Sequence, residues 1–214
     1  MSIILTEISV KPDQTLLPAE ELYADIERHG RTCYLSWDKM TEGSDEDFIE
    51  MIIRRGHESV LEHKSITMRI VCDRGVTHEL VRHRIASYSQ ESTRYCDYKG
   101  AVEFIIPAWS TNIDPGTYSW DHDDSHWDTL ERKWFHSMSR VAQDYAEFRR
   151  LGQSPQQARG VLPNDLKTEI VVTMNLREWR YFFSLRDHKA AHPQMQVVAK
   201  MARKILSEQY PILF

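Results

Sequence analysis

Apolar residues recur along the chain with two periods, one typical of helices and one typical of strands. From Trp127 to Phe148 they follow one another at steps of three and four residues, which predicts a long helix ending near Gly152. The same period, bounded by residues that start or stop helices, predicts further helices over 18–30, 44–56, 73–81 and 177–186, a short helix after Ser154, and a last helix from Pro193. Ser44 is expected to be the N-cap of the second helix.

Alternation of apolar and polar residues marks the strands. Between Lys64 and Cys72 every second residue is apolar, so one face of this strand is expected to be buried. Further strands are expected at 3–10, 102–106 and 167–174, and the polar segment 108–126 is expected to be a surface excursion. Because strands and helices do not alternate strictly, the pattern predicts an α+β fold with a mixed or antiparallel central sheet and long flanking helices.

Composition narrows the class of protein. The 214 residues, 41% of them hydrophobic, suffice for one well-cored domain or two small ones, and a single domain over 1–214 is expected. No segment approaches the ~20 apolar residues of a membrane helix, so a cytoplasmic location is expected. The net charge of -5 argues against a general nucleic-acid binder. The three isolated cysteines (Cys33, Cys72 and Cys96) argue against disulfides and a structural zinc site.

Against this acidic background, one segment is rich in groups that hold anions. The stretch from Arg82 to Tyr95 contains three arginines, a histidine and three serines. Guanidinium groups match phosphate and carboxylate oxygens, and serine hydroxyls add donors without bulk. A small anionic ligand is therefore expected here, although the arginines could instead pair with Glu79 and Glu91.

A second candidate segment is Gly56-His57-Glu58-Ser59, followed by Glu62-His63. Its two histidines lie six residues apart, which on a helix separates them by about 240°. One helix could not offer both to a single metal ion, so a zinc protease is not indicated. His57 and Ser59 could contact a cofactor, or His57 could be an ordinary loop histidine with a local partner.

Three further arginines stand out. Arg159 lies within the otherwise small and apolar Ala-Arg-Gly-Val-Leu-Pro segment, where a buried charge would need an anion or a carboxylate. Asn175 is expected to cap the helix that carries Arg177 and Arg186 on opposite faces. These arginines could serve two ligands, or a ligand and a neighbouring subunit. They could instead be solvated, or ion-paired with Glu178 and Asp187.

No motif for an enzyme nucleophile, a P-loop or a dinucleotide-binding loop is present. Chemistry would therefore depend on a bound cofactor together with electrostatic stabilisation.

The ordered motifs resemble one known family. Arg82-His83-Arg84, followed after seven residues by Ser92, resembles the signature of the flavin-dependent thymidylate synthases. The resemblance continues through the segments at 56–63, 158–163, 175–177 and 185–186, in the same order and spacing. It implies the thymidylate synthase-complementing protein fold and a homotetramer with FAD at subunit interfaces. The implied reaction converts dUMP to dTMP, with methylenetetrahydrofolate as carbon donor and NADPH as reductant.

The resemblance also assigns residues to ligands. The flavin-contacting positions are His57, Ser59, Arg82, His83, Arg84, Gln90, Asn175 and Arg177. The dUMP-contacting positions are Glu79, Arg82, Gln90, Ser92, Thr93, Arg94, Arg159 and Arg186. Arg186 would be catalytic, stabilising the ionised uracil 3-nitrogen, with no enzyme nucleophile and no metal.

This chain departs from the family pattern at four positions. They are Glu79, Gln90, Ser89 and Tyr181, where many members carry Gln, Glu, Asn, and Asn or His, respectively. The change at Tyr181 affects one implied flavin contact.

Two other functions remain as alternatives. A metal-dependent nucleotide phosphohydrolase would need converging His and Asp ligands, for which Asp187-His188 and Asp121-His122 are the adjacent pairs. A non-catalytic nucleic-acid module using Arg82–Arg94 is disfavoured by the net charge.

Overall fold

The structure is a computed structural model that describes residues 2–214, and these residues divide into two compact units. Unit 1 contains the described residues up to Ser9, with Ile70–Arg82 and Ser89–Ile170. Unit 2 contains Val10–Arg69, His83–Tyr88 and Val171–Phe214. This division leaves the expectation of one domain over 1–214 as a prediction.

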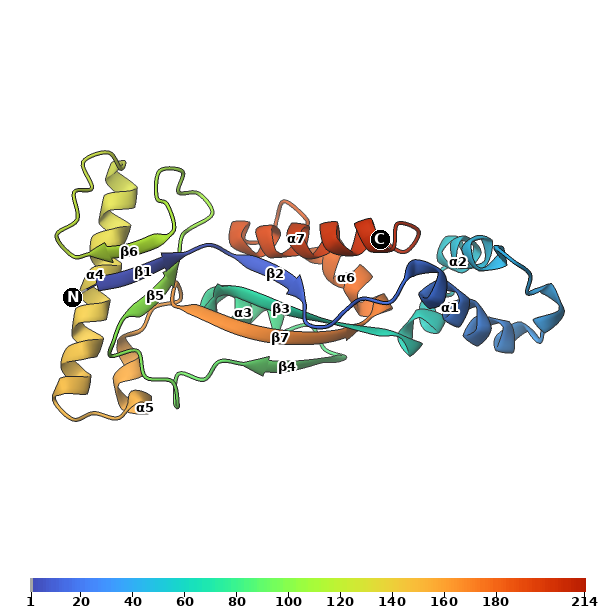
Figure 1. Cartoon of the computed structure of the whole chain (residues 1–214), viewed down its shortest axis with the longest axis horizontal. Helices are drawn as coiled ribbons and strands as arrows, with labels where there is room; N and C mark the ends of the chain where they lie inside the picture. Colours follow the sequence, from blue (N-terminus) through green and yellow to red (C-terminus); the bar gives the residue numbers. More distant parts are fainter. Residues whose placement is uncertain (1) are drawn as a thin grey trace. The chain divides into compact units, whose positions relative to one another are not determined.

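The helical elements are as follows (Figure 1). The α-helices are α1 (Ala19–Tyr34), α2 (Ser44–Arg54), α3 (Arg74–Leu80), α4 (Thr129–Arg150), α5 (Pro155–Ala158), α6 (Leu176–Arg186) and α7 (Pro193–Gln209). The 3-10 helices are η1 (Trp37–Lys39), η2 (Glu58–His63) and η3 (Arg159–Val161).

The strands form two sheets. They are β1 (Ser2–Thr6), β2 (Ser9–Pro12), β3 (Ser65–Asp73), β4 (Ala86–Gln90), β5 (Val102–Ile105), β6 (Gly116–Ser119) and β7 (Lys167–Asn175). One sheet has the order β5-β1-β6, and the other has the order β2-β3-β7-β4. Since β1 pairs parallel with β5 and antiparallel with β6, the first sheet is mixed. The predicted α+β class is therefore confirmed.

The core of unit 1 lies between the β5-β1-β6 sheet and α4. Leu5 and Phe104 from the sheet are almost fully buried, together with Phe135 and Tyr145 from α4. A capping box begins α4, because the Asp128 carboxylate accepts hydrogen bonds from the first turn. The long helical pattern of the sequence thus has a definite start and a buried face.

Glu131 ties the loop before β6 to the first turn of α4. Its buried carboxylate accepts hydrogen bonds from Thr111 N at 2.8 Å and from Asn112 N and Nδ2 at 3.1 and 2.9 Å. Asp128 N donates to it at 3.1 Å. Burial alone would raise the pKa of Glu131, but the hydrogen bonds from Asn112, Asp128 and Thr111 outweigh burial and lower the pKa to about 2.

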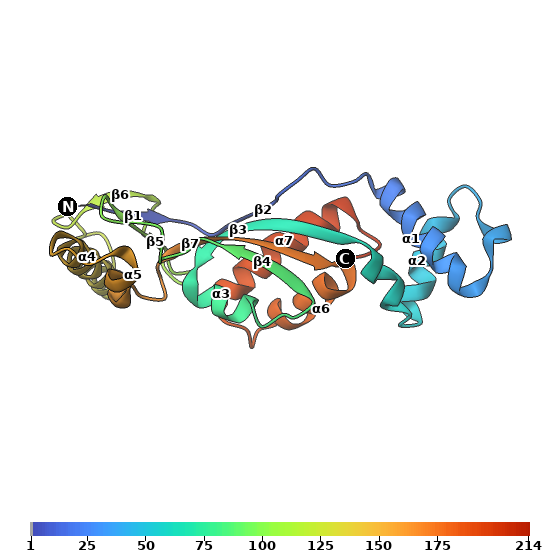
Figure 2. The same ribbon diagram turned by 90° about the horizontal axis from the view of Figure 1, so that it is seen from below.

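In unit 2, α1 and α2 pack closely, as Figures 1 and 2 show from two directions. A Cβ atom on Gly30 would lie only 2.3 Å from the Phe48 ring, so this close approach needs glycine. Glu27 is buried beside the contact, where it accepts hydrogen bonds from Arg31 at 2.6 Å and Ser44 Oγ at 2.9 Å.

The long strands β3 and β7 bury every second side chain, which confirms the alternation read from the sequence. Trp179 of α6 is fully buried within unit 2, and its indole Nε1–H donates to Ile66 O at 3.1 Å. Helix α6 also packs against α7 and η2. These contacts fix the helix that carries several of the candidate site residues.

Three local expectations differ from the structure. The expected opening strand at 3–10 is two strands, because β1 pairs with β5 and β6 while β2 belongs to the other sheet. The polar segment 108–126 contains β6, a sheet-edge strand whose alternating exposure explains its polarity. Ser44 is the first residue of α2 and does not cap it; Gly43, in the left-handed region at φ 77°, precedes the helix.

Among residues 2–214, no helix is both long enough and apolar enough to cross a membrane.

We expect Glu131→Gln to lower the free energy of unfolding at pH 7 by about 2 kcal/mol. The NH2 group of the glutamine would replace one carboxylate oxygen and would face N–H groups that now donate to that oxygen. The pKa of Glu131 is depressed in the folded state, so its contribution is present above the ordinary value of 4.5 and is lost as the pH falls toward about 2. Urea unfolding from pH 7 down to pH 3 should therefore show the two proteins converging. Glu147→Gln, which changes an exposed ion pair of α4, is the control. An equal loss of stability in this control would contradict the stabilising role given to the buried Glu131 carboxylate.

Candidate functional site

The turn from β7 into α6 sets the geometry of the candidate site in unit 2. Asn175 ends the strand and caps the helix, and its side-chain Oδ1 accepts a hydrogen bond from Glu178 N at 2.8 Å. This confirms the expected cap. Arg177 and Glu178 therefore lie in the first turn of α6, and Arg186 lies in the last turn.

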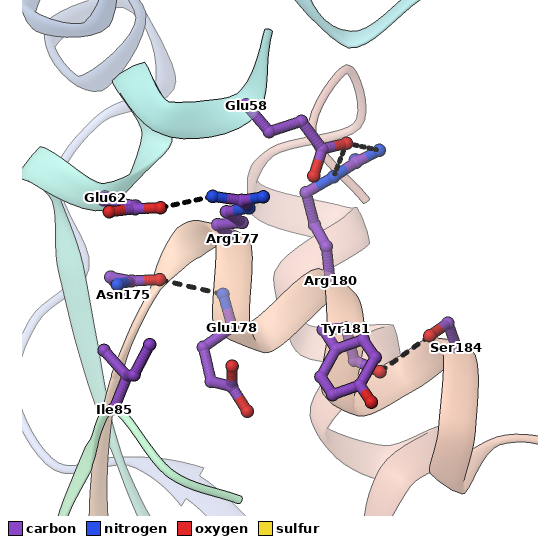
Figure 3. Close-up of a pocket in the computed structure, with 9 residues that line it drawn as sticks. All are labelled: Glu58, Glu62, Ile85, Asn175, Arg177, Glu178, Arg180, Tyr181 and Ser184. Carbon is purple, nitrogen blue, oxygen red and sulfur yellow. Dashed lines mark hydrogen bonds and ion pairs between the residues drawn. The ribbon is translucent and has the colours of Figure 1, made fainter. Parts of the chain in front are cut away.

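The first turns of α6 line a pocket of about 600 Å³ (Figure 3). A pocket of this size lies within the range of cofactor and small-molecule sites. Its lining combines carboxylates, guanidinium groups, an amide, a hydroxyl and two exposed apolar surfaces, contributed by Glu58, Glu62, Ile85, Asn175, Arg177, Glu178, Arg180, Tyr181 and Ser184.

Two ion pairs cross from η2 to α6 at this pocket (Figure 3). Arg177 Nη1 lies 2.5 Å from Glu62 Oε1, and Arg180 Nη2 lies 3.2 Å from Glu58 Oε1. The Arg177–Glu62 pair is about half exposed. Arg177 is thus ion-paired, but its partner is Glu62 of η2 and not the expected Glu178 or Asp187.

A second pocket, of about 320 Å³, shares Glu58 and Arg177 with the first. His57 and Ser59 line it, so the structure brings four of the predicted flavin positions (with Asn175 and Arg177) to two adjoining pockets of unit 2. His57 also has a local partner, because its Nδ1 lies 2.6 Å from the Tyr34 hydroxyl.

The His83 side chain is buried against α6 and bonded at both ring nitrogens. Its Nδ1 lies 3.0 Å from Glu178 Oε1, and Arg186 Nε donates to its Nε2 at 3.0 Å. We call Glu178, His83 and Arg186 the imidazole bridge. An Arg N–H can only donate, so His83 Nε2 must be unprotonated and Nδ1 must carry the proton.

The electrostatics agree with this tautomer. Burial lowers the pKa of His83, the hydrogen bond to Glu178 acts in the opposite direction, and the Arg186 charge lowers the pKa further. The net shift is downward from the ordinary value, so the imidazole is neutral at pH 7. Arg186 thus donates its Nε–H to a neutral acceptor.

Ile85 has a strained backbone at the rim of the larger pocket. Its φ of 71° is in the left-handed region, which a β-branched residue rarely adopts. Its side chain is 77% exposed, so no burial offsets the strain within the chain. Such strain is commonly found at functional sites.

In unit 1, four of the predicted dUMP positions, Gln90, Ser92, Thr93 and Arg94, lie at the end of β4 and in the tight turn that follows it. Gln90 Nε2 donates to Thr77 Oγ1 at 3.0 Å and to Thr168 Oγ1 at 3.3 Å. The next residues form a turn in which Ser92 Oγ accepts from Arg94 N at 3.3 Å. We call residues 90–94 the nucleotide turn.

Arg159 joins the nucleotide turn from η3. Its Nη1 donates to Thr93 Oγ1 at 3.2 Å. The expectation that Arg159 lies in a buried apolar setting is wrong, because its side chain is exposed at the end of a short helix. An exposed guanidinium beside hydroxyl groups is suited to a phosphate.

The carboxylate near this turn is already bonded elsewhere. Glu91 accepts a hydrogen bond from Tyr98 at 2.7 Å and pairs with Lys167 at 3.4 Å. Within residues 2–214, no ion pair joins Arg82, Arg84 or Arg94 to a carboxylate. The alternative in which Glu91 neutralises these arginines is therefore not what the structure shows.

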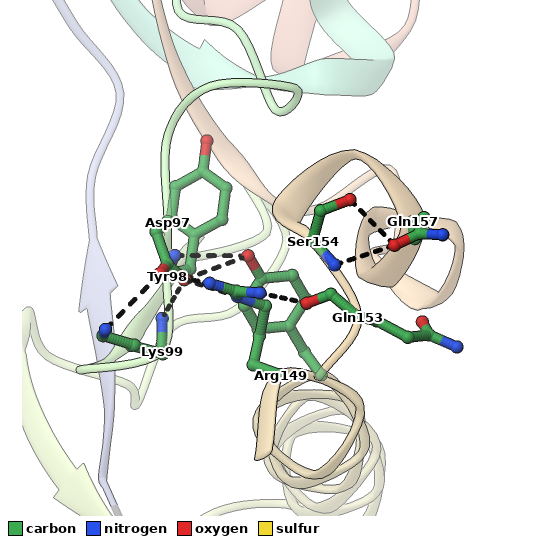
Figure 4. A network of polar contacts seen from close by, with 8 residues as sticks. Asp97, Tyr98, Lys99, Arg149, Gln153, Ser154 and Gln157 are labelled. Carbon is green, nitrogen blue, oxygen red and sulfur yellow. Dashed lines mark hydrogen bonds and ion pairs between the residues drawn. The ribbon is translucent and has the colours of Figure 1, made fainter. Parts of the chain in front are cut away.

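A polar network supports the chain just after the nucleotide turn (Figure 4). Arg149 of α4 donates to both carboxylate oxygens of Asp97, at 3.0 and 2.8 Å. The Arg149 hydrogen bonds lower the pKa of Asp97 to about 2. Since the partners lie 52 residues apart, no local sequence signal reveals this support.

No group of three or more His, Cys, Asp or Glu side chains in residues 2–214 is arranged to hold a metal ion. The phosphohydrolase alternative would have required such a group.

Comparisons with known proteins identify the family. The model of the family described as "Thymidylate synthase complementing protein" matches residues 16–212. The flavin-dependent thymidylate synthase of Pyrococcus furiosus is 39% identical over 168 residues, which are 77% of this chain and 63% of the relative. The enzyme of the same name from Corynebacterium aurimucosum is 34% identical over 200 residues, which are 92% of this chain and 80% of the relative. The chain belongs to this family.

Solved structures support the same fold. A UMP/dUMP methylase from Streptomyces cacaoi, bound with 5-Br UMP, has a TM-score of 0.78 at 21% identity, with 99% of this chain and 94% of that chain covered. Its structure bound with 5-Br dUMP gives a TM-score of 0.75 at 23% identity, with coverage of 99% and 95%. The predicted thymidylate synthase-complementing protein fold is confirmed.

In this member of the thymidylate synthase complementing protein family, the predicted site residues are divided between the two units. Unit 2 holds His57, Ser59, His83, Arg84, Asn175, Arg177 and Arg186, whereas unit 1 holds Glu79, Arg82, Gln90, Ser92, Thr93, Arg94 and Arg159. Their assignment to flavin or dUMP stays a prediction. Arg82 and Arg84 both lie exposed just after α3, as expected for a helix end.

The family resemblance gave no role to several residues that the structure brings to the site. Glu58, Arg180 and Ile85 line the larger pocket, and Glu178 both lines it and bonds His83. Helical spacing does place Glu178 and Arg186 within two turns of each other, but the sequence gives no sign that His83 lies between them.

We expect Ile85→Asn to raise the free energy of unfolding by about 1 kcal/mol, because Asn tolerates the left-handed region and little packing is lost. Ile85→Val keeps the β-branch and should give no gain. Urea denaturation of both variants checks this; a loss of stability in Ile85→Asn would show that the φ of 71° is not strained.

Proposed function

We propose that the protein is a flavin-dependent thymidylate synthase that converts dUMP to dTMP. In this proposal methylenetetrahydrofolate supplies the carbon, FAD carries the hydride, NADPH is the reductant, and the enzyme is a cytoplasmic homotetramer. Family membership supports the reaction class. The observation that carries the mechanism is the Arg186 guanidinium bonded to the neutral His83 imidazole at 3.0 Å, because it supplies a charge whose position is fixed before substrate binds.

The larger pocket of unit 2 has a donor and acceptor set that fits FAD. Arg177 and Asn175 could donate to phosphate and carbonyl oxygens, while Glu58 and Glu62 could accept from ribityl or ribose hydroxyls. Tyr181 is 54% exposed and offers an aromatic surface to a ring system. In the adjoining pocket, Ser59 and His57 extend the same lining. Bound flavin would supply hydride transfer.

The nucleotide turn of unit 1 would hold the phosphate of dUMP. Arg159 and Arg94 bring exposed guanidinium groups, and Ser92 brings a hydroxyl. Thr93 is buried, and its hydroxyl accepts the hydrogen bond from Arg159, which orients that guanidinium. Gln90 is oriented by two threonine hydroxyls and would contact the nucleotide or the flavin.

The reaction needs no enzyme nucleophile. Burial raises the pKa of the Cys72 thiol far above its ordinary value, so Cys72 is not a thiolate at pH 7. Arg186 would stabilise the uracil when its 3-nitrogen loses a proton, which makes the ring carbon more nucleophilic toward the methylene group. Arg186 therefore acts through its charge and its fixed position.

We expect Arg186→Ala to lower kcat for dTMP formation by at least about 100-fold, the range for removal of one preorganised electrostatic group. The purified variant should keep the flavin absorbance and thermal midpoint of the wild type. Arg140→Ala, at an exposed pair on α4, is the matched control and should behave as wild type. A wild-type protein that takes up no FAD on reconstitution would refute the proposal.

We expect Arg159→Ala to raise the KM for dUMP by roughly 10- to 100-fold with a much smaller change in kcat, because loss of a charge-assisted contact to a non-reacting phosphate weakens binding. Steady-state kinetics with dUMP and with deoxyuridine would test this. The variant should discriminate less between the two than the wild type does; unchanged discrimination would remove Arg159 from the phosphate site.

A further inference from the structure

Three residues of α6 form a stripe against the buried imidazole. Glu178, Phe182 and Arg186 are spaced at four-residue intervals, so they lie on one side of the helix over about 12 Å. His83 packs between the two charged ends, and its ring centroid lies 5.1 Å from that of Phe182 in an edge-to-face arrangement. The imidazole thereby links the two charged residues through its two ring nitrogens.

The two ends of the stripe require the same tautomer of His83. The Glu178 carboxylate accepts a hydrogen bond from Nδ1–H at 3.0 Å, and Arg186 Nε donates to Nε2 at 3.0 Å. Because a guanidinium has no acceptor, an imidazole protonated at Nε2 would turn a donor toward a donor. Glu178 thus stabilises the one tautomer in which the ring can accept the hydrogen bond from Arg186.

We propose that Glu178 is a positioning residue for the catalytic guanidinium: its carboxylate fixes the tautomer of His83, and His83 holds Arg186 where the uracil meets it. This inference rests on the proposed function, in which Arg186 contacts the substrate. Glu178 itself need touch neither the uracil nor the reacting atoms.

The surroundings of His83 limit other ways of fixing the ring. The Tyr88 hydroxyl donates to the backbone oxygen of His83 at 2.7 Å, which restrains the main chain and leaves the ring nitrogens to Glu178 and Arg186. Phe182 and Tyr181 contact the ring edge-on and offer no hydrogen bond to either nitrogen. Without the carboxylate, only the Arg186 hydrogen bond still favours the Nδ1–H form, so the advantage of that tautomer over the Nε2–H form falls.

The first test is kinetic. In flavin-loaded enzyme, Glu178→Ala should lower kcat/KM for dUMP by roughly 10- to 100-fold, the effect of losing one charge-assisted hydrogen bond in the bridge. Glu208→Ala, at an exposed pair on α7, is the matched control and should stay within about twofold of wild type. A Glu178→Ala variant within that same range would overturn the proposal.

The second test reads the tautomer directly. Long-range 1H–15N correlation spectra of histidine-labelled protein report which ring nitrogen carries the proton, and the signal missing in His83→Gln identifies His83. The wild type should show the neutral Nδ1–H form at pH 7, and Glu178→Ala should show the Nε2–H form or a mixture. An unchanged tautomer in the variant would overturn the proposal.

The third test asks whether Glu178 acts through Arg186. Binding of dUMP to flavin-loaded protein, measured by equilibrium dialysis, should weaken in Glu178→Ala. In the Arg186→Ala background the same change should add less than about twofold, because coupled residues are not additive. Full additivity would mean that Glu178 acts independently of Arg186, contrary to the proposal.

A failure of the Glu178 proposal can be distinguished from a failure of the proposed synthase function. If Glu178→Ala does not fold, Glu178→Gln takes its place, because it keeps the side-chain volume. Its amide can present either an acceptor or a donor to Nδ1, so this variant should show a mixture of tautomers and a reduced kcat/KM. A wild-type tautomer together with a wild-type kcat/KM would overturn the proposal. If wild-type protein binds dUMP and FAD yet forms no dTMP, the synthase is refuted, while the tautomer comparison still decides whether Glu178 sets the state of His83.

Discussion

The hydrogen bond from Glu178 N to Asn175 Oδ1 fixes the point at which β7 becomes α6, and the site in unit 2 depends on that point. The rotation of a helix about its axis follows from where it begins. A start one residue later would turn every side chain of α6 by about 100°. Arg177 would then leave Glu62, and the stripe facing His83 would be lost.

From this start, α6 presents different chemistry on different sides. Arg177 and Arg180 reach η2 and pair with Glu62 and Glu58 at the pocket. Trp179 is directed into the core and bonds Ile66 O of β3. Glu178 and Arg186 meet His83. One eleven-residue helix therefore serves a pocket, a core and a buried hydrogen-bonded bridge, which explains why its sequence mixes charged and aromatic residues so closely.

Local patterns in the sequence predicted the helices and strands well, but they predicted contacts between residues far apart in the sequence poorly. The alternation in β3, the cap at Asn175 and the long α4 are consequences of neighbouring residues, and each was correctly inferred. The division of 3–10 into β1 and β2 depends on partners more than 50 residues away, and so could not be read locally.

The same limit applies to the site. The family motifs indicated His83 and Arg186, but the bond between them joins residues 103 apart, and the partner at the other ring nitrogen was not indicated at all. Arg159 shows the opposite error. Its small, apolar sequence neighbours suggested burial, whereas it lies exposed at the end of a single turn of helix.

The charged pairs of unit 2 differ in how easily a ligand could replace one of the two partners. Arg177 and Glu62 are 52% and 43% exposed, so water already screens their attraction, and a flavin phosphate could replace Glu62 at little cost. His83 is only 2% exposed in its side chain, and separating it from Glu178 would leave a buried donor without a partner. Ligand binding should therefore rearrange the exposed pairs and leave the imidazole bridge intact, which is the behaviour required of a group that holds Arg186 in place.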